Sequence, residues 1–496
     1  MRWLFFGLLI TNTILASWYV LHGDIFFNSD IGRDFLLLEE LDQKKIVLIG
    51  PRSSGELYHG PLWTYLTYPA YLVGRGNPVI VGWFWVLLAL VATLVSYGIG
   101  NALFSKPVGS MYALMVSLYL SFHTRGMSHP HAAMILIPLW FFCFVRYVTS
   151  SNIGFLIPHV ILSGMIIQLE LAPGIPLAAL SIGALLYLIW KKQQYQHLGV
   201  LLLLPLTLGN FLIFDIRHEH ILAQKLLGFI TPYQGEGLFD YTMFIKNRLF
   251  LLFSSTEILR RDPGGRNLIL FLGMLAGIAL QLRDHNHVVL YRSFLYFYIG
   301  FFLLSFINKG PILYFHLYPL FLLVFLVFCS LLTCRYKKAY TILFVVIYAM
   351  NLVSSVGDAQ DSFGHTGTHK YSWKFLSGVA KQVFSGPEKE FGYFVYSPDI
   401  LGYEMKYTMH YFTRHSNKNI YAFKKMPVTY LVAAPHPPAD PYMLDSWWRI
   451  HQVRITQNPE RVIEFANGYK MEKYVLTKDE QQVYFDPAID PGLHFR

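Results

Sequence analysis

The most constraining feature of this sequence is a series of apolar stretches long enough to cross a lipid bilayer. A transmembrane helix needs roughly 17–25 predominantly apolar residues. Such stretches occur at residues 3–21, 78–99, 107–122, 131–148, 153–170, 174–190, 198–214, 267–282, 288–306, 311–333 and 339–356. They predict a polytopic α-helical membrane protein with about 11 transmembrane helices.

The amino-acid composition supports a membrane protein and excludes an ordinary soluble domain. Hydrophobic residues make up 54% of the 496 residues and charged residues only 14%, whereas soluble domains are roughly a quarter charged. The aromatic content of 17% fits the enrichment of Trp and Tyr at membrane interfaces. The net charge of +10 is scattered between apolar stretches. We therefore predict cytoplasmic anchoring by these cations and no nucleic-acid partner.

The distribution of Lys and Arg predicts the orientation. With a cytoplasmic amino terminus, the residues that face the cytoplasm are Arg2, Lys106, Arg146, Lys191, Lys192, Arg283, Arg335, Lys337 and Lys338. The short loops on the other side carry little beyond Arg125 and Lys309. This positive-inside pattern places the loops 22–77 and 215–266, and the carboxy-terminal tail, outside the cytoplasm. We expect an integral protein of a bacterial inner (plasma) membrane, with its active site facing the periplasm or exterior.

The amino terminus and the cysteines indicate neither processing nor cross-linking. The first apolar stretch resembles a signal peptide with small residues at Ala16 and Ser17, but its length and the later stretches favour an uncleaved span. Cys143, Cys329 and Cys334 lie in or beside apolar stretches. Their spacing matches no disulfide framework and no metal site.

The segments outside the apolar stretches have patterns of their own. Residues 60–78 are aromatic and interrupted by proline, which indicates an interfacial or re-entrant segment. The loop 215–266 is amphiphilic and indicates surface helices. From about Ser372, short apolar runs alternate with turn residues, which predicts a small α/β domain. We predict a membrane domain over residues 1–356 and an extracytoplasmic carboxy-terminal α/β domain over residues 357–496.

The first loop, from His22 to Pro61, contains the strongest candidate for chemistry. If Asp30 begins a helix, Arg33 and Asp34 fall on neighbouring faces, and the leucines that follow would lie in the membrane interface. Such charges could simply solvate an ordinary loop. A carboxylate beside the headgroup layer is, however, well placed to accept a proton from a hydroxyl, while an arginine binds a phosphate.

The later part of this loop, GPRSSGELYHGP, is a weaker candidate for phosphate binding. Arg52 and His59 lie in a cluster of turn residues that could be an ordinary surface turn. Glycine and serine also let backbone amides approach a phosphate, and arginine binds it through two nitrogens.

Three further polar runs lie at the predicted outer ends of spans. They are TRGMSHPHAA with Arg125, His129 and His131, FDIRHEH with Asp215, Arg217, His218, Glu219 and His220, and NKGPILYFHLYP with Lys309, Tyr314 and His316. Their spacings match no standard metal site. We therefore predict cavity lining for the first run, anion binding or ion pairing for the second, and a functional role for His316.

No nucleotide-binding loop and no hydrolase or dinucleotide fingerprint is present in the sequence. The energy for any transfer reaction would then come from an activated lipid substrate.

The run DIGR at Asp30 to Arg33, the turn LYHGPLWTYLTYP and the segment YFHLYPLF together resemble the GT-C membrane glycosyltransferases. The resemblance is to the branch of protein O-mannosyltransferases and the lipid A aminoarabinose transferase, and by layout it covers roughly residues 1–356. It implies an inverting transfer of a sugar from a polyprenyl-phosphate donor to an acceptor hydroxyl of a glycan, lipid or protein. Asp30 would be the catalytic base, with Asp34 as the fallback.

Two positions depart from that family. Its common Asp-Glu pair reads Asp30-Ile31 here, and the Glu-Lys-Pro of the aminoarabinose transferases reads His59-Gly60-Pro61. The lysine that would meet the donor phosphate is therefore absent. The candidates for binding that phosphate are Arg33, Arg52, His59, Arg217, His218 and His316. No cofactor is assigned; a divalent cation is left open.

The alternative function is a membrane transporter, or a flippase or ligase of lipid-linked glycans. A transporter would carry ionisable residues and broken helices near the middle of the membrane. In this sequence most charges lie at the ends of the apolar stretches, which favours the enzyme.

Overall fold

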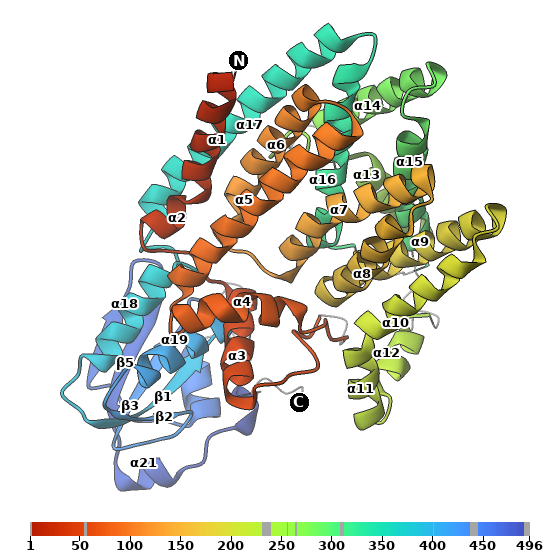
Figure 1. Cartoon of the computed structure of the whole chain (residues 1–496). Helices are drawn as coiled ribbons and strands as arrows, with labels where there is room; N and C mark the ends of the chain where they lie inside the picture. The colour runs from red at the N-terminus through yellow and green to blue at the C-terminus, as the bar shows by residue number, and fades with distance from the viewer. Residues whose placement is uncertain are drawn as a thin grey trace. The chain divides into compact units, whose positions relative to one another are not determined.

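The computed structural model describes residues 2–53, 57–230, 240–254, 256–262, 265–307, 312–399, 401–436 and 445–490 (Figure 1). The helices up to residue 365 are α1 Arg2–Ala16, α2 Trp18–Leu21, α3 Ser29–Lys44, α4 Leu62–Val73, α5 Pro78–Leu103, α6 Lys106–His123, α7 His129–Ser150, α8 Ile153–Leu169, α9 Leu171–Lys191, η1 Tyr195–Leu202, α10 Leu203–Thr207, α11 Gly209–Arg217, α12 Ile221–Ile230, α13 Tyr241–Ser254, α14 Arg266–Arg283, α15 Val288–Ser305, η2 Tyr314–Leu317, α16 Tyr318–Ser330, η3 Leu331–Thr333 and α17 Lys337–His365. Helical structure lies at every one of the predicted apolar stretches.

Among the described residues, 7 helices are long and apolar enough to cross a membrane. They are α5, α7, α9, α14, α15, the η2–η3 segment that contains α16, and α17. An eighth span results if residues 195–207 and 209–217, which bend by 48° between them, count as one. Helices α1 and α8 are apolar but shorter, and α6 carries Lys106 and His123 at its ends. The chain is an integral membrane protein.

The chain packs into two compact units. The first contains residues 1–17, 46–66 and 84–359, and the second contains residues 18–45, 67–83 and 360–496. In the first unit α16 is buried along its whole length, and α7 packs against both α8 and α16. The buried Tyr112 hydroxyl of α6 donates to the Leu322 carbonyl of α16 at 2.9 Å.

The second unit is an α/β domain. Its sheet has the order β2-β1-β3-β5-β4. The strands are β1 Glu390–Tyr396, β2 Asn419–Ala422, β3 Val428–Ala433, β4 Arg461–Glu464 and β5 Lys470–Val475. Strand β1 is parallel to β2 and β3, whereas β5 is antiparallel to β3 and β4. The remaining helices are α18 Trp373–Phe384, α19 Tyr403–Arg414, α20 Asp445–Trp447, η5 Trp448–Val453, α21 Lys478–Gln482 and η6 Pro487–Ile489.

Helix α3 belongs to this second unit and packs along α19. A Cβ atom built on Gly32 would lie only 2.5 Å from the Glu404 backbone nitrogen, so the two helices meet with no room for a side chain. Further along, Glu39 pairs with His410 at 3.3 Å and with Arg414 at 3.8 Å.

The leucines of α3 are not exposed to lipid, contrary to the prediction. They are Leu36, Leu37, Leu38 and Leu41, and all are buried within the protein. The apolar face predicted from the sequence exists, but it is covered by protein instead of membrane.

Candidate functional site

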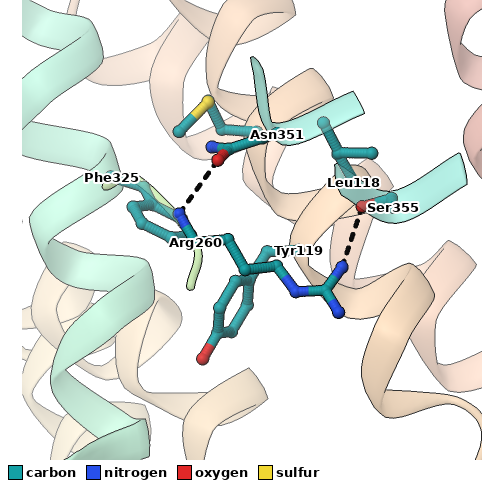
Figure 2. A pocket seen from close by; sticks show the side chains of 7 residues that line it. Leu118, Tyr119, Arg260, Phe325, Asn351 and Ser355 are labelled. Carbon is teal, nitrogen blue, oxygen red and sulfur yellow. Dashed lines mark hydrogen bonds between the residues drawn. The ribbon is translucent and has the colours of Figure 1, made fainter. Parts of the chain in front are cut away.

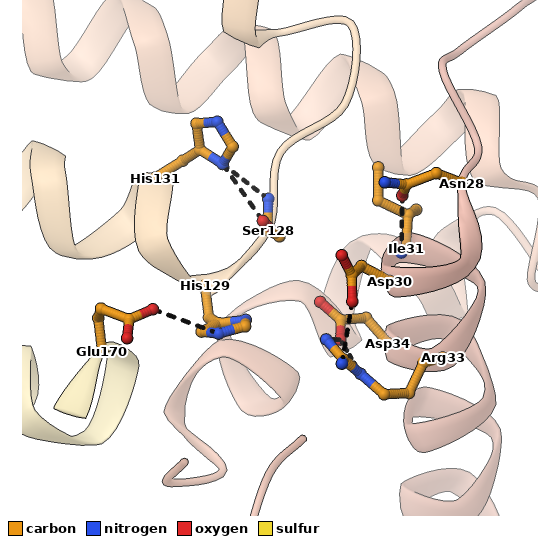
Figure 3. Close-up of polar contacts among 9 residues, drawn as sticks. All are labelled: Asn28, Asp30, Ile31, Arg33, Asp34, Ser128, His129, His131 and Glu170. Carbon is orange, nitrogen blue, oxygen red and sulfur yellow. Dashed lines mark hydrogen bonds and ion pairs between the residues drawn. The ribbon is translucent and has the colours of Figure 1, made fainter. Parts of the chain in front are cut away.

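The first turn of α3 brings Asp30, Arg33 and Asp34 together. Asn28 is the N-cap of α3. Its side chain accepts a hydrogen bond from the Ile31 amide at 3.1 Å and so stabilises the start of the helix. Arg33 then contacts Asp30 at 3.0 Å and Asp34 at 3.2 Å (Figure 3). The predicted helix and the predicted proximity of these groups are both present.

The two carboxylates of this group differ in exposure. The Asp30 side chain is 65% exposed, whereas that of Asp34 is 8% exposed. Burial lowers the pKa of Arg33, but the charges of Asp34 and Asp30 outweigh it and leave that pKa raised. Arg33 is therefore a permanent cation that holds Asp30 in place, and Asp30 is the more exposed of the two carboxylates.

A buried acid lies on the helix that packs against this turn. Glu404 is in the first turn of α19, and its burial raises the pKa of its carboxyl group to about 7. The sequence analysis did not identify it, because an acid at a helix start is ordinarily a solvated capping residue.

His59 is held by backbone hydrogen bonds in the first unit. Arg52 pairs with Tyr58 in an isolated bridge, and His59 exchanges backbone hydrogen bonds with Gly50 and Pro51 at 2.8 and 2.9 Å. The next amide, that of Gly60, donates to the Gln168 carbonyl of α8 at 2.7 Å. Residues 54–56 of this turn lie outside the described part of the chain.

These contacts bring His59 to His129 and Glu170, and all three side chains are buried. The imidazole rings of His59 and His129 have centroids 4.2 Å apart. His129 Nε2 lies 3.5 Å from a Glu170 carboxylate oxygen (Figure 3). One donor atom of each residue lies within 4.8 Å of those of the other two, a spacing that could hold a metal ion.

The two histidines of the run SHPH, His129 and His131, lie in different clusters. His129 joins the cluster just described, whereas His131 Nε2 lies 3.0 Å from His123 Nδ1. Both His123 and His131 also contact the ring of Tyr318. The prediction of cavity lining treated the two histidines alike, and the structure gives them different neighbours.

A second polar cluster surrounds Arg260. Its guanidinium donates to Ser355 at 2.9 Å and pairs with Asp358, and its backbone amide donates to Asn351 at 2.9 Å. Burial lowers the pKa of this arginine. Figure 2 shows it beside a small pocket lined by Met115, Leu118, Tyr119, Phe325, Asn351 and Ser355.

Arg125 lies near this cluster. The guanidinium carbons of Arg125 and Arg260 are each 3.8 Å from the ring centroid of Phe122, so one aromatic ring contacts two cations.

The other predicted phosphate ligands occupy separate positions. Arg217 and His218 are exposed at the end of α11, where His218 stacks on Phe214 with centroids 4.0 Å apart. The His316 ring accepts a hydrogen bond from the Leu313 amide at 3.2 Å and so caps the short helix η2. Lys309 lies outside the described residues.

Like Glu404, Glu170 and Arg260 are residues of these polar clusters that the sequence analysis missed. Glu170 is a single acid within the apolar sequence from Ile153 to Lys191. An isolated ionisable group in such a sequence is itself a sign of function, and that sign would have identified it. Arg260 lies in a charged loop where no pattern sets it apart.

Comparison with known proteins establishes the fold. No protein-family model and no curated protein matches the chain. The crystal structure of ArnT, a lipid A aminoarabinose transferase, from Cupriavidus metallidurans bound to undecaprenyl phosphate is similar with a TM-score of 0.58 at 12% identity. The apo structure gives 0.56 at 12% identity, and each match covers 95% of this chain and 97% of ArnT.

An oligosaccharyltransferase from Archaeoglobus fulgidus is similar with a TM-score of 0.47 at 11% identity, over 86% of this chain and 67% of that one. The likeness to ArnT confirms the predicted fold, a GT-C-like membrane domain with a small α/β domain.

Proposed function

We propose that this protein is an inverting glycosyltransferase that moves a sugar from a polyprenyl-phosphate donor to an acceptor hydroxyl on the extracytoplasmic face. The observation that carries the proposal is the exposed Asp30 carboxylate, held by Arg33 at the start of a capped helix. The fold is shared with ArnT, which binds undecaprenyl phosphate, and this supports a lipid donor of the same kind.

In the proposed reaction Asp30 accepts the proton of the acceptor hydroxyl. The hydroxyl oxygen forms a bond to the anomeric carbon of the sugar, and the bond from that carbon to the phosphate oxygen breaks. The polyprenyl phosphate leaves with the electron pair. Its negative charge requires fixed cations or hydrogen-bond donors, and the candidates remain Arg52, His59, Arg217, His218 and His316.

Arg33 was also a candidate for the phosphate. In this structure its guanidinium contacts both Asp30 and Asp34. We therefore assign it the positioning of the base. The proposal leaves open the sugar and whether the acceptor is a glycan, a lipid or a protein. No cofactor is assigned, and a divalent cation stays open.

The test compares Asp30→Asn with a matched change on the same helix. Asp42 also pairs with a cation, Lys45 at 3.1 Å, and accepts a hydrogen bond from Tyr68, but it lies three turns from Asp30. Cells lacking the gene would carry wild type, Asp30→Asn or Asp42→Asn. Mass spectrometry would then measure lipid-linked sugars and surface glycans.

We expect cells with Asp30→Asn to have the same glycans as cells lacking the gene, with the lipid-linked sugar accumulating. The reason is that loss of a general base lowers the rate by about 10²–10⁴-fold. Asp42→Asn should behave like wild type. Normal glycans in the Asp30→Asn strain, at equal protein level, would refute the role of Asp30. Unchanged lipid-linked sugars and glycans in the strain without the gene would refute the glycosyltransferase itself.

A further inference from the structure

We propose that Glu404 is a positioning residue that keeps the first turn of α3, and with it Asp30, packed against α19. The inference rests on the proposed function, because Asp30 is the base in that reaction. It adds the group that fixes where the base lies.

The first turns of α3 and α19 are in direct contact within the second unit. Gly32 lies against the backbone of Tyr403 and Glu404, and a Cβ atom added to Gly32 would be 2.5 Å from the Glu404 nitrogen. The Glu404 side chain faces Ser29, which lies one turn before Gly32. Asp30 lies between these two contact positions, so any movement of this turn also moves Asp30.

Glu404 is a buried acid whose carboxyl group is only partly satisfied. The residue is 3% exposed, and no described residue forms a hydrogen bond with its Oε2 atom. The arginine on the facing turn, Arg33, is paired with Asp30 and Asp34. A buried carboxylate that lacks partners is far more costly than a buried neutral carboxyl group, so this contact favours the protonated acid.

The groups around Glu404 act in both directions on its pKa. Burial is the largest cause that raises the pKa, and the negative charge of Asp399, in the loop before α19, adds to it. The Glu404 amide, the Ser29 hydroxyl and Lys370 lower the pKa. Tyr469, which precedes β5, also faces the carboxyl group. The resulting pKa is about 7, so a large share of the chains carry neutral Glu404 at neutral pH.

Ionisation of Glu404 should open this contact. The anion needs water, but at Gly32 the two helices leave no room even for a methyl group. Solvation of the anion therefore requires the first turn of α3 to move away from α19, and Asp30 moves with it. Protonated Glu404 holds the base in place, and transfer falls as the pH rises through about 7.

The first experiment measures amide hydrogen exchange in full-length protein in nanodiscs at pH 6 and pH 8, as protection relative to the intrinsic rate at each pH. The peptide of interest contains the amides of Ile31 and Gly32, which bond to Asn28. Helix α18 of the same unit is the reference. The variants are Glu404→Gln, which is neutral at both pH values, and the matched control Glu464→Gln, at a side chain that is 68% exposed.

In wild type and in Glu464→Gln, we expect the protection of this turn to fall by up to about tenfold from pH 6 to pH 8. The reason is that the fraction of chains with neutral Glu404 falls by about this factor around a pKa of about 7. Glu404→Gln should show no such fall, and α18 should keep its protection in all three proteins. If Glu404→Gln fails to fold, the wild-type pH series decides.

The second experiment repeats the glycan measurement in cells that lack the gene and carry wild type, Glu404→Gln or Glu464→Gln, kept at an external pH of 6 or 8. Rates are divided by the protein level, so a change of stability alone does not alter the pH profile. The rate with Glu404→Gln relative to wild type should rise by up to about tenfold from pH 6 to pH 8. Glu464→Gln should keep the wild-type rate at both.

Equal pH profiles of transfer in wild type and Glu404→Gln would overturn the positioning role. Unchanged protection of the turn between pH 6 and pH 8 in wild type would overturn it as well. Unchanged glycans in the strain lacking the gene would refute the proposed function instead, and hydrogen exchange would then decide the contact of Glu404 with α3 by itself.

Discussion

The ionisation of one residue, Glu404, makes the stability of the folded protein depend on pH. Its folded pKa of about 7 is raised by burial above the ordinary value of 4.5, so the folded chain retains this proton longer than the unfolded chain. The resulting stability is fully present below about pH 4.5 and is lost as the pH rises through about 7. At roughly 1.4 kcal/mol per pKa unit, the loss is at most about 3.5 kcal/mol.

Glu404→Gln should therefore remove most of the fall in stability between pH 5 and pH 8. Thermal unfolding at the two pH values, followed by intrinsic fluorescence, measures this difference. Equal pH dependence in wild type and variant would show that Glu404 ionises at its ordinary pKa in the folded chain.

At the scale of single residues, the sequence predicts contacts between residues that are close together along the chain. The helix start at Asn28 and the approach of Arg33 to Asp30 follow from spacing along one helix. The cluster of His59 with Glu170 does not, because it joins positions more than 100 residues apart through the packing of a turn on α8. The sequence pattern of either segment alone therefore does not predict the contact between His59 and Glu170.

The close approach of α3 and α19 depends on one glycine. Gly32→Ala should destabilise the second unit by about 1–3 kcal/mol, because its new methyl group meets the backbone of Tyr403 and Glu404, which cannot rotate away. Gly378→Ala is the control. It lies in α18 of the same unit with nothing within 4 Å of the added carbon.

Unfolding of both variants in detergent, monitored by tryptophan fluorescence, tests this. Gly378→Ala should be neutral or more stable by up to about 1 kcal/mol, since alanine favours a helix over glycine. A Gly32→Ala variant as stable as Gly378→Ala would mean that the helices do not meet at Gly32.

Among elements, apolar length predicts where helices form, and the short apolar runs after Ser372 predict the α/β domain in which β1, β3 and β5 lie. The sequence could not tell what covers an apolar face. The leucines of α3 would suit lipid and protein equally, because both exclude water, and only the packing of α19 decides between them.

For the whole molecule, the Lys and Arg distribution predicts that Lys478 and Lys338 lie on opposite sides of the membrane. Both side chains are exposed. Lys478→Cys should react with a membrane-impermeant maleimide added to the outside of intact cells, and Lys338→Cys only after lysis. The three native cysteines are buried, so the parent chain should label weakly. The reverse labelling pattern would invert the predicted orientation.

The discontinuous second unit has a consequence for biosynthesis. Glu39 and its partner His410 are separated by 371 residues, and a ribosome adding about 5–20 residues per second needs roughly 20–70 seconds to cover that distance. During this interval α3 emerges with its leucines uncovered. The nascent chain therefore needs a chaperone or the membrane surface to protect that helix until the last quarter of the polypeptide arrives.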